Sequence, residues 1–356
     1  MLALVVLTLA GAVYLSSRIA LFPFAARVFS SRRAALLGGA AAVAVLAAAL
    51  FFLLGAINTA AVFLHLLAVW LVCDGLRLIF GVSAVHYRAG VAAICLSAAV
   101  LVFAWVSAHR VVRTEYLLET EKALPQESFK LVGFSDSHVG ATFGGEKLNE
   151  YVELMNAENA DAAVIVGDFV DDGSTEAELR AACRALAGLK TKYGVFYVFG
   201  NHDKAFDPAA RGYGREGLVR ELEKNGVTVL EDEAVTLCPG VTLVGRQDRS
   251  VRGRAEIASL LSGETGYVIV LDHQPTDFSA EAGAGADLVL SGHTHGGQLF
   301  PIGAIIARFN DRVYGHEKRG GTDFIVSSGI ADWELGFKTG CVSEYFSVTV
   351  TQRPQS

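Results

Sequence analysis

The sequence predicts a membrane region over residues 1–109, a linker over 110–128 and an α/β domain over 129–356. Mean hydropathy is +0.40, a value that soluble domains rarely reach. Charge is divided unevenly, because residues 1–110 hold seven arginines and a single acid, Asp74, of the 30 basic and 37 acidic residues in the chain. Short apolar runs and amphipathic segments alternate in the last part, which is typical of α/β folds.

The charge balance also limits the possible functions. Seven basic residues and one acid give the first part +6, so the overall net charge of −7 leaves −13 for the rest. An acidic domain without a basic patch repels nucleic-acid backbones, and we expect no nucleic-acid partner. A disulfide framework or structural zinc site is disfavoured because no C-x-x-C pair occurs. The five cysteines are Cys73, Cys95, Cys183, Cys238 and Cys341.

The membrane region contains enough apolar sequence for four crossings. Residues 1–17 carry no charged side chain, and residues 34–73 continue without a charge beyond the roughly 20 residues of one crossing. The stretch 55–59 divides this long run. The alternative for the first segment is a cleaved signal peptide, but the basic residues that should precede it are absent. The expected transmembrane helices cover residues 1–17, 34–54, 60–80 and 89–109.

Basic residues near the ends of these segments predict their orientation. Six of them flank the loops after the first and third helices, and three follow the fourth helix. Because basic loops stay in the cytoplasm, both termini and the α/β domain should lie outside the cell membrane. The first group is Arg18, Arg27, Arg32, Arg33, Arg77 and Arg88, and the second is Arg110, Arg113 and Lys122.

Few polar side chains occur inside the expected membrane helices. His65 is explained most simply by a hydrogen bond to a neighbouring helix. Asp74 and Arg77 lie three residues apart, which suits a local ion pair. The segments therefore give no indication of a transporter.

Five apolar, strand-like runs of the domain each end in Asp, Asn or His. The runs are 129–134, 162–166, 195–199, 267–271 and 287–290. Helices are expected over 147–160, 175–189 and 215–225. Ligands of α/β folds bind beyond the carboxyl ends of the strands, so we expect the polar residues that follow these runs to form one site.

The composition of that site favours metal ions. Burying several carboxylates and imidazoles together is costly unless cations neutralise them. Asp, Asn and His ligands without Cys fit Mn²⁺, Fe or Zn²⁺. The number of candidates exceeds the needs of one ion, so two ions that share a carboxylate are expected.

These motifs resemble the ordered signature of the calcineurin-like metallophosphoesterase superfamily. The matching blocks are Asp136-x-His138, Gly167-Asp168, Gly200-Asn201-His202-Asp203, His273 and Gly292-His293-x-His295. The continuation to Gln298 and Pro301, and the turn at 326–330, are similar to its bacterial membrane-associated branch. The Pro-x-Arg usual in that branch is replaced by 333–338, a departure that concerns the substrate rather than the metals.

The resemblance implies a four-layer α-β-β-α sandwich and a role for each matched residue. One metal would be held by Asp136, His138 and His295, and the other by Asn201, His273 and His293. Asp168 would bridge the two metals, which would hold a hydroxide that attacks phosphorus. His202, oriented by Asp203, would stabilise the transition state or protonate the leaving oxygen.

These expectations describe a membrane-anchored dimetal phosphoesterase that cleaves a phosphodiester or phosphomonoester, with a lipid-linked or envelope substrate. One alternative is a pyrophosphatase of nucleotide-linked lipid precursors, similar to UDP-diacylglucosamine hydrolases, whose domain would face the cytoplasm. A non-catalytic membrane sensor is disfavoured by the intact ligand set. Arg246 and Arg249 could contact a substrate phosphate, and arginines in a surface turn are the equal alternative; Arg308, Arg312 and Lys338 have the same ambiguity.

Overall fold

The computed structural model describes residues 2–83, 87–205 and 207–353, and these form two compact units. The first residue of the first expected membrane helix and the last three residues of the expected domain lie outside this description. One unit comprises residues 1–106 and 334–337, and the other comprises the remainder.

The first unit consists of apolar helices. Two of them, α3 and α4, are long and apolar enough to cross a membrane, and α1 contains a shorter apolar stretch over Val5–Ile19. The expected second and third membrane helices are one 48-residue element in the structure. The helices are α1 (Leu2–Ile19), α2 (Pro23–Val28), α3 (Arg32–Ile79) and α4 (Arg88–His109).

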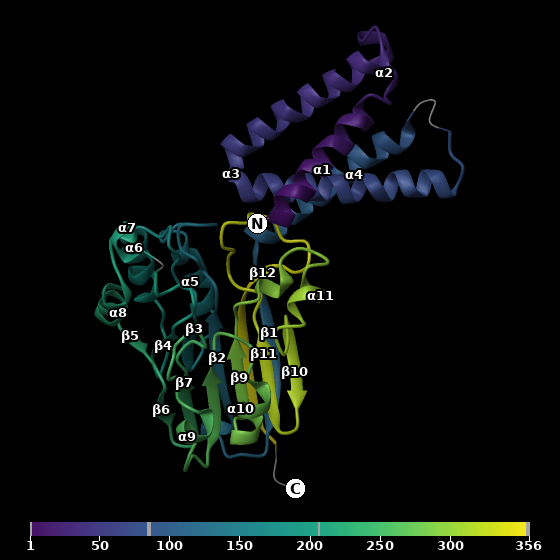
Figure 1. The fold of residues 1–356 in the computed structure, drawn as a ribbon. Coiled ribbons are helices and arrows are strands. Elements are labelled where there is room, and N and C mark those ends of the chain that lie inside the picture. Colours follow the sequence, from purple (N-terminus) through teal and green to yellow (C-terminus); the bar gives the residue numbers. More distant parts are fainter. Residues whose placement is uncertain (1, 84–86, 206, 354–356) are drawn as a thin grey trace. The chain divides into compact units, whose positions relative to one another are not determined.

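Gly55 divides α3 at the position where the sequence predicts a break. Its φ of 80° and ψ of 174° are not helical, and glycine adopts this backbone conformation readily. Figure 1 shows the two halves of α3 meeting at a sharp bend. The bend makes α3 two helical segments in space.

The second unit confirms the expected α/β class and contains two six-stranded sheets. The first has the order β1-β12-β2-β3-β4-β5 and is parallel except where β12 pairs with β2. Its strands are β1 (Val111–Thr120), β2 (Ser128–Phe134), β3 (Ala162–Val166), β4 (Val195–Val198), β5 (Val227–Val229) and β12 (Ser343–Gln352).

The second sheet has the order β10-β11-β9-β8-β7-β6, with a parallel centre and antiparallel pairs at both edges. Its five-residue central strands are fully buried, which explains their continuous apolar sequences. The strands are β6 (Glu233–Cys238), β7 (Val241–Gly245), β8 (Tyr267–Leu271), β9 (Leu288–Ser291), β10 (Gly315–Arg319) and β11 (Thr322–Val326).

Alternate residues of the central strands belong to different apolar cores. In β3, Val164 packs between the two sheets, whereas Ile165 faces a core shared with α5, α6 and α8. In β8, Ile269 belongs to the core between the sheets and Val270 to a third core with α9 and α10. These helices are α5 (Leu148–Asn156), α6 (Glu176–Leu186), α8 (Arg215–Lys224), α9 (Ile257–Leu260) and α10 (Phe278–Ala284), and two further short helices are α7 (Pro208–Arg211) and α11 (Gly303–Ile306). Figure 1 shows α5, α6 and α8 on one side of this unit.

The expected helical linker over 110–128 is wrong in its main part. Residues 111–120 form β1, which pairs in parallel with β12 along its whole length. Valine, threonine and tyrosine favour a strand, and the partner β12 lies about 230 residues later in the chain, where a local sequence pattern gives no sign of it. Only Arg110 separates α4 from β1, so the domain follows α4 directly.

Candidate dimetal centre

The residues that follow the strands meet where the two sheets end. Asp136 and His138 follow β2, and the other candidates follow β3, β4, β8 and β9. The ligand atoms of the predicted metal ligands form two groups in which all atoms lie within 4.8 Å of one another, and His138 forms a third such group with Asp171 and His202. The first two groups are Asp136, His138 and His295, and Asp168, His273 and His293.

Asp168 lies between the two groups. Its Oδ2 is 3.1 Å from His273 Nε2 and 3.8 Å from His138 Nε2, so one oxygen faces an imidazole of each group. Its Oδ1 accepts a hydrogen bond of 2.8 Å from the backbone N–H of His202. This is the geometry expected of a shared ligand.

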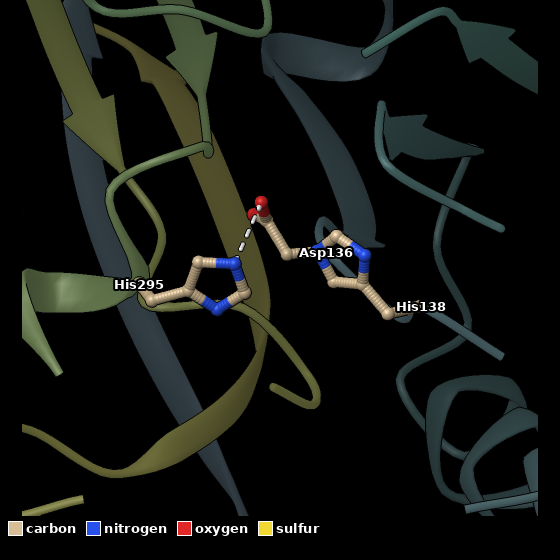
Figure 2. Close-up of side chains that lie close together, drawn as sticks. All are labelled: Asp136, His138 and His295. Carbon is tan, nitrogen blue, oxygen red and sulfur yellow. Dashed lines mark ion pairs between the residues drawn. The ribbon is translucent and has the colours of Figure 1, made fainter. Parts of the chain in front are cut away.

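The first group combines one carboxylate with two imidazoles in a fully buried position. Figure 2 shows the Asp136 carboxylate directed toward the His295 ring, and Asp136 Oδ1 lies 3.6 Å from His295 Nε2. The rings of His138 and His295 stack with centroids 5.2 Å apart. Neither ring nitrogen of His138 has a hydrogen-bond partner in the described part of the chain. A divalent cation would satisfy one of these nitrogens, so the residues fit a metal.

The second group also presents ligand atoms that are free to bind a metal. His273 Nδ1 donates to the backbone carbonyl of Val166 at 2.8 Å, which leaves Nε2 as the free nitrogen facing Asp168. Burial lowers the pKa of His293 to about 4, so the ring is neutral and can bind a metal. Asn201 adds a buried Oδ1 that lacks a hydrogen-bond donor among the described residues.

The backbone around these side chains is strained and tightly packed. A Cβ at Gly200 would lie 2.1 Å from Asp168 Oδ1, and a Cβ at Gly292 would lie 2.3 Å from Asp136 Oδ2. The two glycines therefore make room for the carboxylates. Positive φ angles at non-glycine residues carry an energetic cost and are concentrated at functional sites. Those in the site are Asp136, His138, Asp168, His293 and His295.

Asp171, which the sequence analysis missed, lies between two of the predicted site residues. Its Oδ1 is 3.0 Å from His202 Nδ1, and its Oδ2 is 3.4 Å from His138 Nδ1. The hydrogen bond from His202 to Asp171 raises the pKa of His202 to about 9. His202 therefore carries a proton at neutral pH. The sequence signal was a second carboxylate three residues after Asp168, on the same turn.

The expected orientation of His202 by Asp203 is wrong. The Asp203 carboxylate points to the backbone, where it accepts hydrogen bonds of 2.7–3.0 Å from the N–H groups of Asp168, Phe169, Val170 and Gly200. A buried carboxylate needs several donors, and these backbone groups provide them. Asp203 thus connects the loops after β3 and β4, and Asp171 orients His202.

A second buried carboxylate, that of Asp332, contacts the His295 ring nitrogen that does not face Asp136. Asp332 Oδ1 lies 3.4 Å from His295 Nδ1 and 3.1 Å from the ammonium of Lys338. Lys338 also donates to the carbonyl of Ser328 at 2.9 Å and to Ser343 Oγ at 3.1 Å, and its side chain is completely buried. The segment that replaces the usual Pro-x-Arg therefore keeps a buried cation. It also places Trp333 with its ring 5.6 Å from that of His202.

We expect Lys338→Met to lower the free energy of unfolding by about 3–5 kcal/mol, because it leaves the Asp332 carboxylate buried without its cation. Urea unfolding of the detergent-solubilised full chain, followed by proteolysis of the unfolded domain, measures the loss. The double variant Asp332→Asn/Lys338→Met should recover a large part of the stability. A double variant as unstable as the sum of the two single variants would contradict this coupling.

The arginines considered for substrate contact have other partners. Arg246 is buried, and its Nη1 lies 3.0 Å from Asp272 and 2.8 Å from Asp277. Arg249 donates to Thr276 Oγ1 at 2.9 Å. The surface-turn alternative is therefore also wrong for Arg246, which neutralises buried acids. Of the remaining candidates, Arg312 pairs with Glu317, Lys338 with Asp332, and Arg308 is exposed.

Comparisons with known proteins agree with this fold. Residues 129–297 match the family model of the calcineurin-like phosphoesterases. The chain is 32% identical over 226 residues to an uncharacterized metallophosphoesterase of Aquifex aeolicus, which covers 61% of this chain and 82% of that protein. A Helicobacter pylori metallophosphoesterase is 32% identical over 237 residues, which covers 64% of this chain and 60% of that protein.

A relative that is named as a transmembrane protein also matches. The zebrafish (Danio rerio) transmembrane protein with metallophosphoesterase domain is 33% identical over 242 residues, which covers 62% of this chain and 53% of that protein. The chain thus spans little more than half the length of some of its relatives. The two ligand groups define a candidate metal-dependent hydrolase. By its identity to the Aquifex protein, the chain belongs to the calcineurin-like metallophosphoesterases.

Proposed function

We propose that this chain is a membrane-anchored phosphoester hydrolase that uses two divalent metal ions to cleave a phosphodiester or phosphomonoester. The observation that carries the proposal is the shared position of Asp168 Oδ2, 3.1 Å from one ligand group and 3.8 Å from the other. His202, a protonated imidazole, lies beside the same carboxylate. The intact ligand set argues against a non-catalytic sensor.

Each residue of the site has a role in this proposal. When bound, Mn²⁺, Fe or Zn²⁺ ions lower the pKa of water and neutralise charge on the phosphoryl oxygens. Asp136, His138 and His295 would hold one ion, Asn201, His273 and His293 would hold the other, and Asp168 would be shared by both. Asp171 fixes the His202 ring through Nδ1, which leaves Nε2 free to give a proton to the leaving oxygen.

The helical unit is proposed to cross the membrane four times. The bend at Gly55 divides α3 into residues 32–54 and 56–79, each about 35 Å long at 1.5 Å per residue. Each half exceeds the bilayer core of about 30 Å. With α1 and α4, this gives the four crossings that the sequence predicts.

A substrate in or near the membrane is the second part of the proposal. The domain begins at β1, only one residue after α4 ends, so the chain tethers it within a short reach of the bilayer. We therefore favour a lipid-linked or envelope phosphoester over a freely diffusing one.

Purified, detergent-solubilised chain should hydrolyse bis(p-nitrophenyl) phosphate or p-nitrophenyl phosphate in the presence of Mn²⁺. Chelation should abolish the activity, and added Mn²⁺ should restore it. Envelope phospholipids are then tested as substrates in mixed micelles. Absence of activity on every ester in the metal-loaded chain, with Mn²⁺, Fe²⁺ and Zn²⁺ tested in turn, would overturn the proposal.

The basic residues predict the side on which the domain lies. Because six flank the inner ends of the helices and three the outer ends, a C-terminal alkaline phosphatase fusion should be active. A C-terminal fluorescent protein that matures only in the cytoplasm should be dark. The opposite pattern would place the site in the cytoplasm and favour cleavage of a nucleotide-linked lipid precursor.

A further inference from the structure

The helical unit contains a polar cluster around Asp74, the only acidic residue among the first 110. Tyr14 donates to Asp74 Oδ2 at 2.7 Å, and Tyr87 donates to both carboxylate oxygens at 3.2 Å. Two arginines also approach it, with Arg18 Nε at 3.2 Å and Arg77 Nε at 3.5 Å. The cluster is therefore larger than the expected local pair of Asp74 and Arg77.

The charges of this cluster do not balance. Two guanidinium groups share one carboxylate, which leaves a net charge of +1 inside an apolar unit. The Nε atoms of Arg18 and Arg77 are buried, and their ion pairs with Asp74 lack the geometry of a hydrogen bond. One cation in excess is costly in apolar surroundings, so an anion would be stabilised here.

An apolar cavity of about 410 Å³ lies between α1, both halves of α3, and α4. Its walls include Leu15 and Ile19 of α1, Phe63 and Trp70 of α3, and Leu101 of α4. The volume lies within the range of roughly 300–1,000 Å³ that ligand pockets have. An unbranched hydrocarbon chain suits these apolar walls.

A hydrogen bond joins the wall of the cavity to the polar cluster. Trp70 is part of the cavity wall, and its Nε1 donates to Tyr87 Oη at 3.0 Å. On α1, the wall residues Leu15 and Ile19 directly follow Tyr14 and Arg18 in the sequence. One end of the apolar space is therefore adjacent to the excess positive charge.

Ser97 gives an independent indication of a ligand. This residue of α4 is 2% exposed, lines the same cavity, and its hydroxyl has no hydrogen-bond partner among the described residues. A buried hydroxyl without a partner costs free energy that a ligand oxygen would recover. The carbonyl oxygen of an acyl ester is an acceptor of the required kind.

We propose that this cavity binds a phospholipid whose headgroup has a net negative charge. One acyl chain fills the apolar space, and the phosphate pairs with Arg18 and Arg77, whose fork-shaped guanidinium groups suit phosphate oxygens. A headgroup that also carries an ammonium would bring a second cation to a site that already has one in excess. Anionic lipids are therefore preferred over zwitterionic ones. The site is separate from the candidate metal centre and does not depend on its activity.

Thermal unfolding of the delipidated full chain in detergent tests the proposal, with phosphatidylglycerol and phosphatidylcholine of identical acyl chains as probes. Phosphatidylglycerol should raise the melting temperature progressively as its concentration increases, and phosphatidylcholine should have a much smaller effect. In the variant Arg18→Gln/Arg77→Gln, the phosphatidylglycerol concentration needed for the same shift should rise at least about tenfold. Native mass spectrometry should show a matching loss of retained lipid.

The matched control is Arg27→Gln/Arg33→Gln, which removes the same charge from exposed positions of the same unit. This control should keep the wild-type response to phosphatidylglycerol. Circular dichroism and hydrolysis of bis(p-nitrophenyl) phosphate establish that both variants are folded. A wild-type chain stabilised equally by the two lipids would overturn the proposal. So would an unchanged response of the Arg18/Arg77 variant, or an equal loss in the control.

Discussion

Asp168→Asn should release metal from both positions and abolish hydrolysis at the same time. One Asp168 oxygen faces His273 and His138, so its charge contributes to both ligand groups. Replacing a residue that only supports a metal ligand typically lowers the metal affinity about 10–100-fold. Removing the charge of a bridging ligand should lower it further. Elemental analysis of the purified chain gives the metal content, and hydrolysis of bis(p-nitrophenyl) phosphate gives the activity.

The matched control for this variant is Asp171→Asn, which removes a carboxylate three residues further along the same loop. Asp171 contacts Nδ1 of His202 and of one proposed ligand, His138, rather than both groups, so this variant should lose much less metal than Asp168→Asn. An Asp168→Asn chain that keeps two ions and remains active would refute the bridging role. Equal metal loss in the two variants would make Asp171 a ligand as well.

The positions of the seven candidate ligands could be predicted because each directly follows a short apolar run. Val164 and Ile269 lie in strands of different sheets, yet both strands end at the same site. The sequence order of the blocks and their glycines carries this information, since Gly200 and Gly292 leave no room for a side chain beside Asp168 and Asp136. A local sequence pattern is therefore sufficient to predict the positions of site residues that lie at the ends of strands.

The supporting residues could not be predicted in the same way. Asp171 and Asp203 are both carboxylates close to predicted ligands, and only the path of the loop decides which one meets the His202 ring. Lys338 has the sequence appearance of a surface residue, but its pairing with Asp332 allows complete burial. β1 depends on a partner strand at the other end of the domain. Each of these features is determined by tertiary contacts.

His202→Ala should leave the metal content close to wild type and lower kcat by roughly 10²–10⁴, the range of general acid catalysis. The imidazole hydrogen-bonds Asp171 through Nδ1 at 3.0 Å, and its only candidate ligand group is the one with His138 and Asp171, which contains neither Asp168 nor Asp136. The loss should be much smaller for a nitrophenyl ester, whose leaving group needs no proton, than for an alkyl ester. Steady-state kinetics on a series of esters with leaving groups of increasing pKa measures this dependence.

Asp171→Asn tests, with the same series of esters, whether Asp171 orients the His202 ring or has only a structural role. The amide no longer provides a carboxylate acceptor for the imidazole, so the proton held on His202 is lost more easily. We expect a smaller decrease in kcat than in His202→Ala, with the same stronger loss for alkyl esters. A uniform decrease across the series in both variants would show that His202 stabilises charge in the transition state without donating a proton. Loss of metal in His202→Ala would instead make His202 a ligand.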